Sequence, residues 1–182
     1  ERFPSSVRLR WAGYEVLRPC GQPAMAEALL NEILGMANAS PMDYRDAGSL
    51  VAVGQAAMLR GADPKQVLDK LFEQAKRREP TFRDAYLAAG ALALGKNDFE
   101  LAATQYREGL ERFAQDADFY YGLARAYASS DPGLTTTNLE KALEFNPNHI
   151  PARLMWVDHL IDSEEYPAAA KQLDEVATVN AW

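Results

Sequence analysis

The sequence predicts an all-α solenoid of about five antiparallel helical hairpins, and three observations carry that prediction. Residues of similar character recur every 34 or 33 positions along the 182-residue chain. Within each repeat the apolar residues follow the helical period, and an alternation of period two is absent. Acidic residues followed by proline stand where helices should begin. Repeats of this length bury their apolar faces by stacking against their neighbours.

The repeat register rests on two independent series of residues. On the predicted first helices, Tyr86 lies 34 positions before Tyr120. On the predicted second helices, large apolar residues recur at steps of 34, 33 and 34, at Phe72, Tyr106, Leu139 and Leu173. The register divides a single domain, residues 1–182, into a degenerate hairpin at 5–40 and repeat units at 47–82, 83–116, 117–149 and 150–182.

The first two hairpins follow the pattern least well. Residues 5–40 are expected to form a helical pair with weak consensus. The next unit carries Gly54 on its first helix, and Asp63-Pro64 opens its second helix, since Asp accepts a backbone hydrogen bond and proline needs no donor there. This unit fits the register only if two extra residues enter its internal turn, around Gly61 to Asp63.

The unit 83–116 fits the register best. The stretches "DAYLAAGALAL" and "FELAATQYREGLERF" are expected to form its first and second helices. Gly95 should end the first helix, Lys96 and Asn97 should form the turn, and Asp98 should cap the second helix. Small residues should let the two backbones approach closely while aromatic rings fill the remaining volume. The small residues are Gly90, Ala102 and Gly109, and the rings are those of Tyr86, Phe99 and Tyr106.

The last two units repeat this design with departures. Asp131-Pro132 and Tyr166-Pro167 are expected to open their second helices. In the unit 117–149, Thr135 stands where a small residue is usual, so a looser helix crossing is expected. The run from Thr135 to Thr137 consists of poor helix formers, which predicts a frayed or shortened second helix.

This pattern resembles the tetratricopeptide repeat (TPR) family over about three quarters of the chain. In that family an aromatic and a small residue on the first helix pair with Ala, an aromatic and Ala on the second. The unit 83–116 matches at Tyr86, Gly90, Ala102, Tyr106 and Gly109. The resemblance implies a right-handed α–α superhelix. Because the chain begins without Met and its last unit ends without a polar capping face, we expect a piece of a larger protein.

The resemblance also implies a binding groove. Family members usually bind ligands along the concave first helices, at the second, fifth, ninth and twelfth places of each unit. Carried over by position, these places hold Asp84, Leu87, Ala91, Leu94, Asp118, Tyr121, Arg125, Ala128, Leu154, Asp158 and Ile161. Lys and Asn, with which family members clamp a C-terminal carboxylate, are absent from these places, which disfavours a chaperone-tail receptor.

Two neighbouring tyrosines are expected to divide between core and groove. Adjacent residues point about 100° apart on a helix. Tyr120 aligns with Tyr86 and should pack, which leaves Tyr121 facing the groove beside Arg125 at i+4. Aromatic and Arg side chains are typical binding anchors, but an intramolecular cation–π pair fits the same spacing.

No stretch of the sequence predicts a catalytic or metal site. "GALALGKN", Gly90 to Asn97, approaches a phosphate-binding loop, but it follows a helical pattern rather than a strand and ends without Ser or Thr. His149, in a predicted loop after proline, and His159, on a predicted helix, have no His or Cys at ligand spacing, and Cys20 is the single cysteine. We therefore expect no enzyme, no cofactor and no metal.

Net charge and the length of the apolar stretches restrict the classes of partner that this chain could bind. The net charge of −7 disfavours nucleic acid, and the longest apolar stretch is too short for membrane insertion. The leading interpretation is a non-catalytic protein–protein interaction scaffold that binds a peptide or partner domain in its groove. The alternative is a regulatory or positioning arm of a larger enzyme, for example a hydrolase, whose catalytic domain lies outside this chain. A third is self-association through uncapped ends. The sequence leaves the partner and the compartment open.

Overall fold

The computed structural model describes residues 6–40 and 43–179, and every regular element within them is a helix. The chain forms two compact units, Glu1–Leu92 and Ala93–Trp182. The expectation of a single domain over 1–182 stays a prediction. The expected hairpin bounds at residue 5 and at residue 182 lie outside the described residues.

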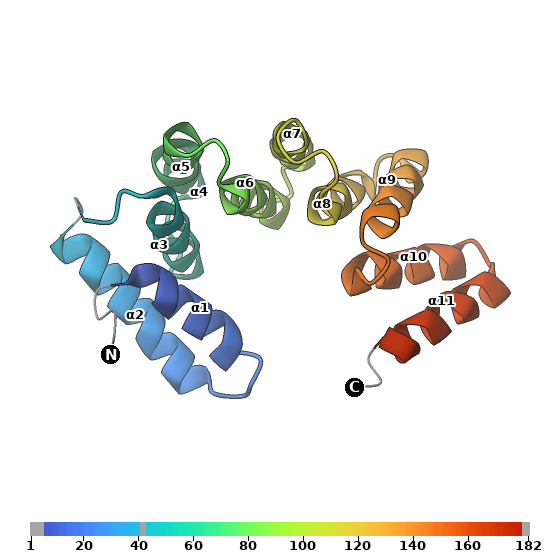
Figure 1. Ribbon diagram of the computed structural model, residues 1–182, viewed down its shortest axis with the longest axis horizontal. Helices are drawn as coiled ribbons and strands as arrows, with labels where there is room; N and C mark the ends of the chain where they lie inside the picture. Colours follow the sequence, from blue (N-terminus) through green and yellow to red (C-terminus); the bar gives the residue numbers. More distant parts are fainter. Residues whose placement is uncertain (1–5, 41–42, 180–182) are drawn as a thin grey trace. The chain divides into compact units, whose positions relative to one another are not determined.

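The first unit contains the two upstream hairpins (Figure 1). α1 (Val7–Leu17) pairs with α2 (Pro23–Ala39). α3 (Ala47–Leu59) pairs with a composite second helix, which runs through α4 (Pro64–Val67), the π-helical segment η1 (Leu68–Phe72) and α5 (Glu73–Arg78). α6 (Arg83–Gly95) begins in this unit.

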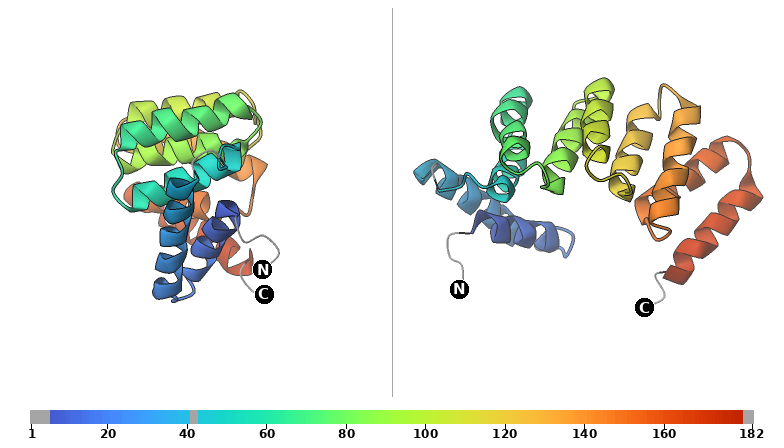
Figure 2. Two further views of the ribbon diagram at one scale, coloured as in Figure 1. Left: turned by 90° about the vertical axis from the view of Figure 1, so that its left-hand side faces the viewer. Right: turned by 45° about the horizontal axis from the view of Figure 1, so that its top comes forward.

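The second unit continues with regular helical pairs. α7 (Phe99–Leu110) packs on α8 (Ala117–Tyr127), and α8 packs on α9 (Pro132–Phe145). α10 (Ile150–Asp162) contacts both α9 and α11 (Tyr166–Val179). Figure 2 shows these pairs from two further directions. The expected helices at 83–116, 117–149 and 150–179 are therefore confirmed in the described residues.

The expected helix caps are confirmed at three second helices. An Asp carboxylate accepts a backbone N–H from the residue three positions on in each case, which satisfies a donor that the helix leaves unpaired. The N···O distances are 2.8 Å at Asp63, 3.1 Å at Asp98 and 2.9 Å at Asp131. Local side-chain chemistry thus sets where these helices begin.

Four hairpin turns share one backbone geometry. Gly21, Gly61, Asn97 and Glu164 each have a positive φ, of 73°, 80°, 58° and 61°. The residue after each donates its N–H to the carbonyl five positions back, with N···O distances of 3.0, 3.0, 3.0 and 2.8 Å. This is the Schellman helix ending, in which a left-handed residue lets the chain reverse. The predicted helix end at Gly95 and turn at Asn97 are confirmed.

The structure corrects the placement of the two extra residues in the unit 47–82. In the unit 83–116 the cap Asp98 directly follows the left-handed Asn97. In the unit 47–82 one residue separates the left-handed Gly61 from the cap Asp63, so this turn holds one extra residue. The other lies within the second helix, where η1 widens the backbone and Glu73 N–H donates to the Leu68 carbonyl. A π-helical turn absorbs one inserted residue and leaves the register of the later helical residues unchanged.

We expect deletion of the exposed Asp69 from η1 to be tolerated, with a change below about 1 kcal/mol in the free energy of unfolding, because the segment can become an ordinary α-helix. Deleting the exposed Thr104 from α7 is the control. It should cost about 3 kcal/mol or more, because a regular helix would rotate its buried residues by about 100°. Urea denaturation compares them, and equal losses would contradict the assignment of η1 as an insertion.

Small residues and rings interlock in the second unit. Ala102 is fully buried, and Gly109 faces the ring of Phe119, while Gly122 faces the ring of Tyr106. Both small residues are buried, and Gly109 faces α8 of the following hairpin, so the close approach of the two helices of the unit 83–116 stays a prediction. The expectation for Phe99 was wrong, because its side chain is 39% exposed in the first turn of α7.

A repeated hydrogen bond joins three of the first helices, α6, α8 and α10, to the turn before each. The hydroxyl groups of Tyr86 and Tyr120 donate to the carbonyls of Pro80 and Ala114, at 3.0 and 3.1 Å. One period later, the guanidinium of Arg153 donates to the Pro147 carbonyl at 2.5 Å. Tyr86 is buried, whereas Tyr120 is half-buried. The repeated feature is therefore the bond rather than the residue type.

The threonine run does not shorten the helix that contains it. α9 extends unbroken from Pro132 to Phe145. Thr135 is buried, and its hydroxyl donates to the Asp131 carbonyl at 2.9 Å. The hydroxyl oxygen of Thr136 lies 3.2 Å from Nε2 of His159 on α10. The prediction of a shortened helix was wrong, because these hydroxyl groups find partners inside the hairpin stack.

Candidate functional site

An open groove of about 510 Å³ lies between α8 and α10 in the second unit. Its floor and walls are mostly apolar, with one positive and one negative side chain. The lining residues are Tyr121, Arg125, Ala128, Pro151, Leu154, Met155 and Asp158. Leu154 is 44% exposed, so a large apolar side chain stands open to a partner. A mixed surface of this kind suits a peptide with both apolar and charged groups.

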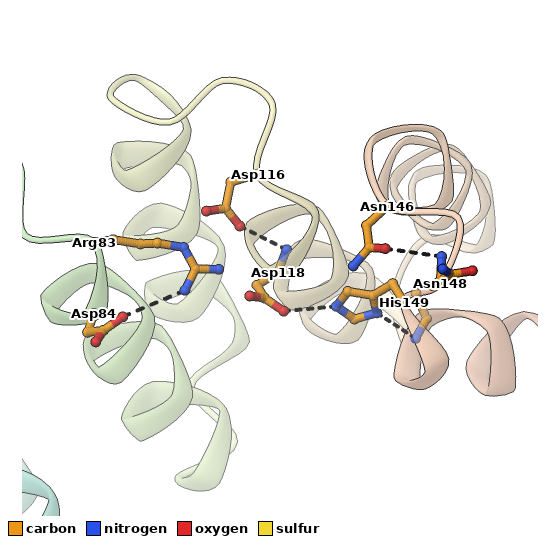
Figure 3. Close-up of polar contacts among 8 residues, drawn as sticks. Arg83, Asp84, Asp116, Asp118, Asn146, Asn148 and His149 are labelled. Atoms are coloured by element: carbon orange, nitrogen blue, oxygen red, sulfur yellow. Dashed lines mark hydrogen bonds and ion pairs between the residues drawn. The ribbon is translucent and has the colours of Figure 1, made fainter. Parts of the chain in front are cut away.

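A buried histidine braces the two walls of this groove. His149 is the N-cap of α10, and its Nδ1 accepts the Ala152 N–H at 3.0 Å. Nε2 must then carry the ring proton, which it donates to Asp118 Oδ1 on α8 at 2.9 Å (Figure 3). The ring also lies against Tyr121, with centroids 5.1 Å apart. Asp118 is thus a positioning residue that ties α8 to α10.

Tyr121 and Arg125 form the cation–π pair that their spacing allows. The guanidinium carbon of Arg125 lies 5.8 Å from the Tyr121 ring centroid. Within the described residues, no carboxylate lies within ion-pair distance of Arg125, whose side chain is exposed. The pair therefore holds an available guanidinium in place at the groove.

Arg125 also influences the core below it. Burial raises the pKa of the Tyr106 hydroxyl to about 12, although the positive charge of Arg125 partly opposes this rise and Tyr121 adds to it. The Tyr106 hydroxyl therefore remains protonated, and neutral, through the physiological pH range. It adds no negative charge beneath the guanidinium.

The first unit has a separate pocket of about 430 Å³. It is formed by the first helices of three successive hairpins, α1, α3 and α6, and by the residue before α6. Its larger and polar lining residues are Arg8, Trp11, Glu15, Val51, Gln55, Phe82, Asp84 and Leu87, and small residues, among them Gly48 and Ala91, complete the lining. Asp84 also lies 3.6 Å from the neighbouring Arg83 (Figure 3).

The expected groove residues fall into distinct places. Those at the α8–α10 groove are Tyr121, Arg125, Ala128, Leu154 and Asp158, and those at the first-unit pocket are Asp84, Leu87 and Ala91. Asp118 bridges to His149, and Ile161 is 45% exposed outside the groove lining. Leu94 is not available to a partner, because its side chain is only 7% exposed and belongs to the buried core.

Sequence reasoning missed several lining residues that its own register marks. Pro151 occupies the second place of the unit 150–182, and Gly48, Val51 and Gln55 occupy the second, fifth and ninth places of the unit 47–82. A unit start at Val7 gives the same places in α1, with the lining residues Arg8, Trp11 and Glu15. Extending the repeat register to the two upstream hairpins would therefore have identified these lining residues.

His149 was interpreted as a loop residue, whereas the structure makes it a helix cap. Proline follows two positions later, as it often does at the start of a helix, and this was the available signal. His159 contacts Thr136, which is a structural hydrogen bond. In residues 6–40 and 43–179 no three His, Cys, Asp or Glu side chains form a group that could hold a metal ion.

No helix in the described part of the chain combines the length and the apolar character required to span a bilayer. No model of a known protein family matches the sequence. One curated relative, "Protein O-mannosyl-transferase TMTC3" of Homo sapiens, is 31% identical over 102 residues. The match covers 54% of this chain and 11% of that protein, so the chain corresponds to a small part of this relative.

Solved structures show the fold. MamA from Desulfovibrio magneticus RS-1 superposes with a TM-score of 0.62 at 19% identity, covering 97% of both chains. PilF of Pseudomonas aeruginosa gives a TM-score of 0.67 at 17% identity, covering 97% of this chain and 78% of PilF. YrrB, described as "a TPR protein with an unusual peptide-binding site", gives 0.56 at 17% identity, covering 81% and 73%.

These likenesses and the helical pairs define the class of protein. The chain has a TPR-like helical-repeat fold, and the predicted all-α solenoid class is confirmed. Because each of these three structural likenesses is below 25% identity, they establish the fold alone, and the role must be inferred from the surface of this chain.

Proposed function

We propose that this chain is a non-catalytic protein-interaction scaffold that binds an extended peptide segment of a partner in the α8–α10 groove. The observation that carries the proposal is the groove itself. It brings together the exposed Leu154 of α10 and Arg125 of α8, which forms no ion pair with any residue that the structure describes, although the two residues are 29 positions apart by their numbers. Aromatic and Arg side chains beside an open apolar surface are typical binding anchors.

The geometry supports a preformed site rather than one that must be assembled on binding. The Asp118–His149 hydrogen bond fixes the spacing of the groove walls, and the stacked Tyr121 holds Arg125. Groups that are held before binding lose less conformational entropy when the partner arrives. The described residues offer apolar contacts and charges along the groove, and YrrB, which has a comparable fold, is described as having an unusual peptide-binding site.

A display selection tests the proposal. A random peptide library is selected on the purified chain, and the affinities of the retained peptides are measured for the chain and its Leu154→Glu variant. We expect the variant to bind at least about tenfold more weakly, because a carboxylate would replace the apolar contact. Retained peptides that bind the variant as well as the parent chain would place their site outside this groove.

The matched control is Leu134→Glu. Leu134 on α9 is 42% exposed, nearly the same as Leu154, but it does not line the groove. The control variant should bind the retained peptides as the parent chain does. Failure to select any peptide that distinguishes the two variants would contradict a groove receptor.

A second candidate function is a helical arm that positions or regulates a catalytic domain of a larger enzyme. The likeness to part of a protein named as an O-mannosyl-transferase favours it. An immunoblot of the source cells with antiserum against this chain tests it. The arm requires a band well above the mass of 182 residues, and a band at that mass would exclude it.

A further inference from the structure

An apolar stripe lies exposed along one face of α1. Leu9, Ala12 and Val16 recur at helical spacing, and the side chains of Leu9 and Val16 are 59% and 62% exposed. With the unit start at Val7, these three residues occupy the third, sixth and tenth places of their unit. The same places of α8 are all buried, and they hold Phe119, Gly122 and Ala126. A surface that is core in α8 is therefore open in α1.

The contacts of α8 show which element covers these places. α7, the second helix of the preceding hairpin, packs on α8. A Cβ at Gly122 would lie 2.5 Å from the ring of Tyr106, and a Cβ at Gly109 would lie 2.4 Å from the ring of Phe119. The third and sixth places of a first helix thus pack against a second helix. The α1 stripe, Leu9, Ala12 and Val16, matches a surface that receives such a helix.

α11 exposes the opposite half of this contact. Tyr166, Ala170 and Leu173 lie on one face of α11 at helical spacing, and the side chains of Tyr166 and Leu173 are 61% and 44% exposed. Leu173 belongs to the series of large apolar residues that marks the second helices. The equivalent places of three earlier second helices are at most 3% exposed, and they hold Phe72, Tyr106 and Leu139. The open α11 face, Tyr166, Ala170 and Leu173, therefore corresponds to the surface with which α7 covers α8.

The charges beside the two surfaces have opposite signs. α7 and α8 run antiparallel, so a helix that packs on α1 in the same way places its first turn beside the last turn of α1. The exposed Arg18 follows α1, and the exposed Glu164 and Glu165 precede α11. None of these three side chains forms an ion pair with a residue that the structure describes. Complementary charges of this kind favour one partner in one orientation.

We propose that two copies of this chain associate head to tail, with the α11 face of one copy packed on the α1 stripe of the other. The contact repeats the packing of α7 on α8 and brings Glu164 and Glu165 of one copy beside Arg18 of the other. It joins two different surfaces, so each pair of copies keeps one free surface of each kind.

This contact is distinct from a peptide site. The stripe uses the third, sixth and tenth places of its unit, whereas the second, fifth, ninth and twelfth places face the groove of the family that the sequence resembles. Of the stripe residues named, Ala12 also borders the first-unit pocket. The proposal does not depend on the function proposed for the α8–α10 groove.

Sedimentation velocity of the whole chain over a range of concentrations tests the proposal. We expect the weight-average sedimentation coefficient to rise with concentration below about 1 mM. Leu9→Glu and Leu173→Glu should each weaken the association at least about tenfold, because a carboxylate replaces an apolar contact. The control Leu134→Glu changes a similarly exposed leucine on α9 and should associate as the parent chain does. A parent chain that remains monomeric up to this concentration would overturn the proposal.

Mixing the two variants gives the sharper readout. Leu9→Glu keeps an intact α11 face, and Leu173→Glu keeps an intact α1 stripe. An equimolar mixture should therefore form a 1:1 dimer with an affinity close to that of the parent chain, and the assembly should stop at two copies. Variants that had lost their fold, or that used a contact between two like surfaces, would not recover on mixing. A mixture that associates no better than either variant alone contradicts the head-to-tail contact.

Charge reversal tests the orientation. Arg18→Glu should weaken the association about fivefold, because it places like charges beside each other where α1 ends. Arg112→Glu is the matched control, because it makes the same change of charge at an exposed residue in the turn after α7. It should leave the association unchanged. Equal losses in the two variants would refute the antiparallel packing of α11 on α1.

Discussion

Gly109→Ala should destabilise the chain by about 2–3 kcal/mol, although alanine favours helix by about 1 kcal/mol over glycine. A Cβ at this position would lie 2.4 Å from a ring carbon of Phe119, closer than real carbon atoms approach. The Phe119 ring cannot retreat, because it is fully buried and lies between Tyr106 and Phe113, with centroid distances of 6.4 and 5.9 Å. α7 and α8 must therefore separate.

Gly35→Ala is the matched control, because Gly35 lies within α2 and a Cβ there meets nothing within 4 Å. The same substitution should stabilise the chain by about 0.5–1 kcal/mol at this site, since it lowers the entropy of the unfolded state. Urea denaturation followed by circular dichroism measures both variants. Effects of the same sign would show that the contact with Phe119 does not dominate at Gly109.

Arg153→Ala should release α11 from the rest of the second unit. Arg153 is only 8% exposed, and its guanidinium donates to Gln172 at 2.6 Å and to Glu175, both on α11. It also donates to the Pro147 carbonyl in the preceding turn. Charge-assisted hydrogen bonds of this kind contribute about 1.5–3 kcal/mol each, though not additively. We expect α11 amides to exchange hydrogen at least about tenfold faster.

Arg153→Tyr separates the two roles of this residue. Tyr86 and Tyr120 show that a tyrosine at the equivalent place can donate to the turn carbonyl. The variant should restore the bond to Pro147 but leave α11 exchanging as fast as in Arg153→Ala. If α11 in the alanine variant remained as protected as in the parent chain, Arg153 would not be the residue that docks it.

Much of the fold could be predicted because its signals are local. Helical periodicity, the caps at Asp63, Asp98 and Asp131, and the turn at Asn97 each depend on a few neighbouring residues, and all appear in the structure. The insertion in the unit 47–82 was also detectable as two extra residues. The sequence could not show that one extra residue lies in the turn and the other in η1, because the free-energy cost of a π-helical turn depends on the packing around it.

The candidate site was likewise predictable only in part. The register alone placed Tyr121, Arg125 and Leu154 on first helices, and the groove between α8 and α10 brings them together. It also selected Leu94, which is buried, because a position in a repeat does not reveal how closely neighbouring helices approach. Burial depends on contacts between residues distant in sequence, so it follows only from the packed structure.

Sequence alone was enough to establish the repeat and the helix limits, because period and capping are properties of short segments. The packed chain was needed to show that His149 caps α10 and binds Asp118, and that Arg8 rests on Gly48 beside Phe82. Apart from the local cap, the contacts of His149 with Asp118 and of Arg8 with Gly48 and Phe82 join residues 31 to 74 positions apart by their numbers. Their partners are chosen by the stacking of whole hairpins, which no local pattern encodes.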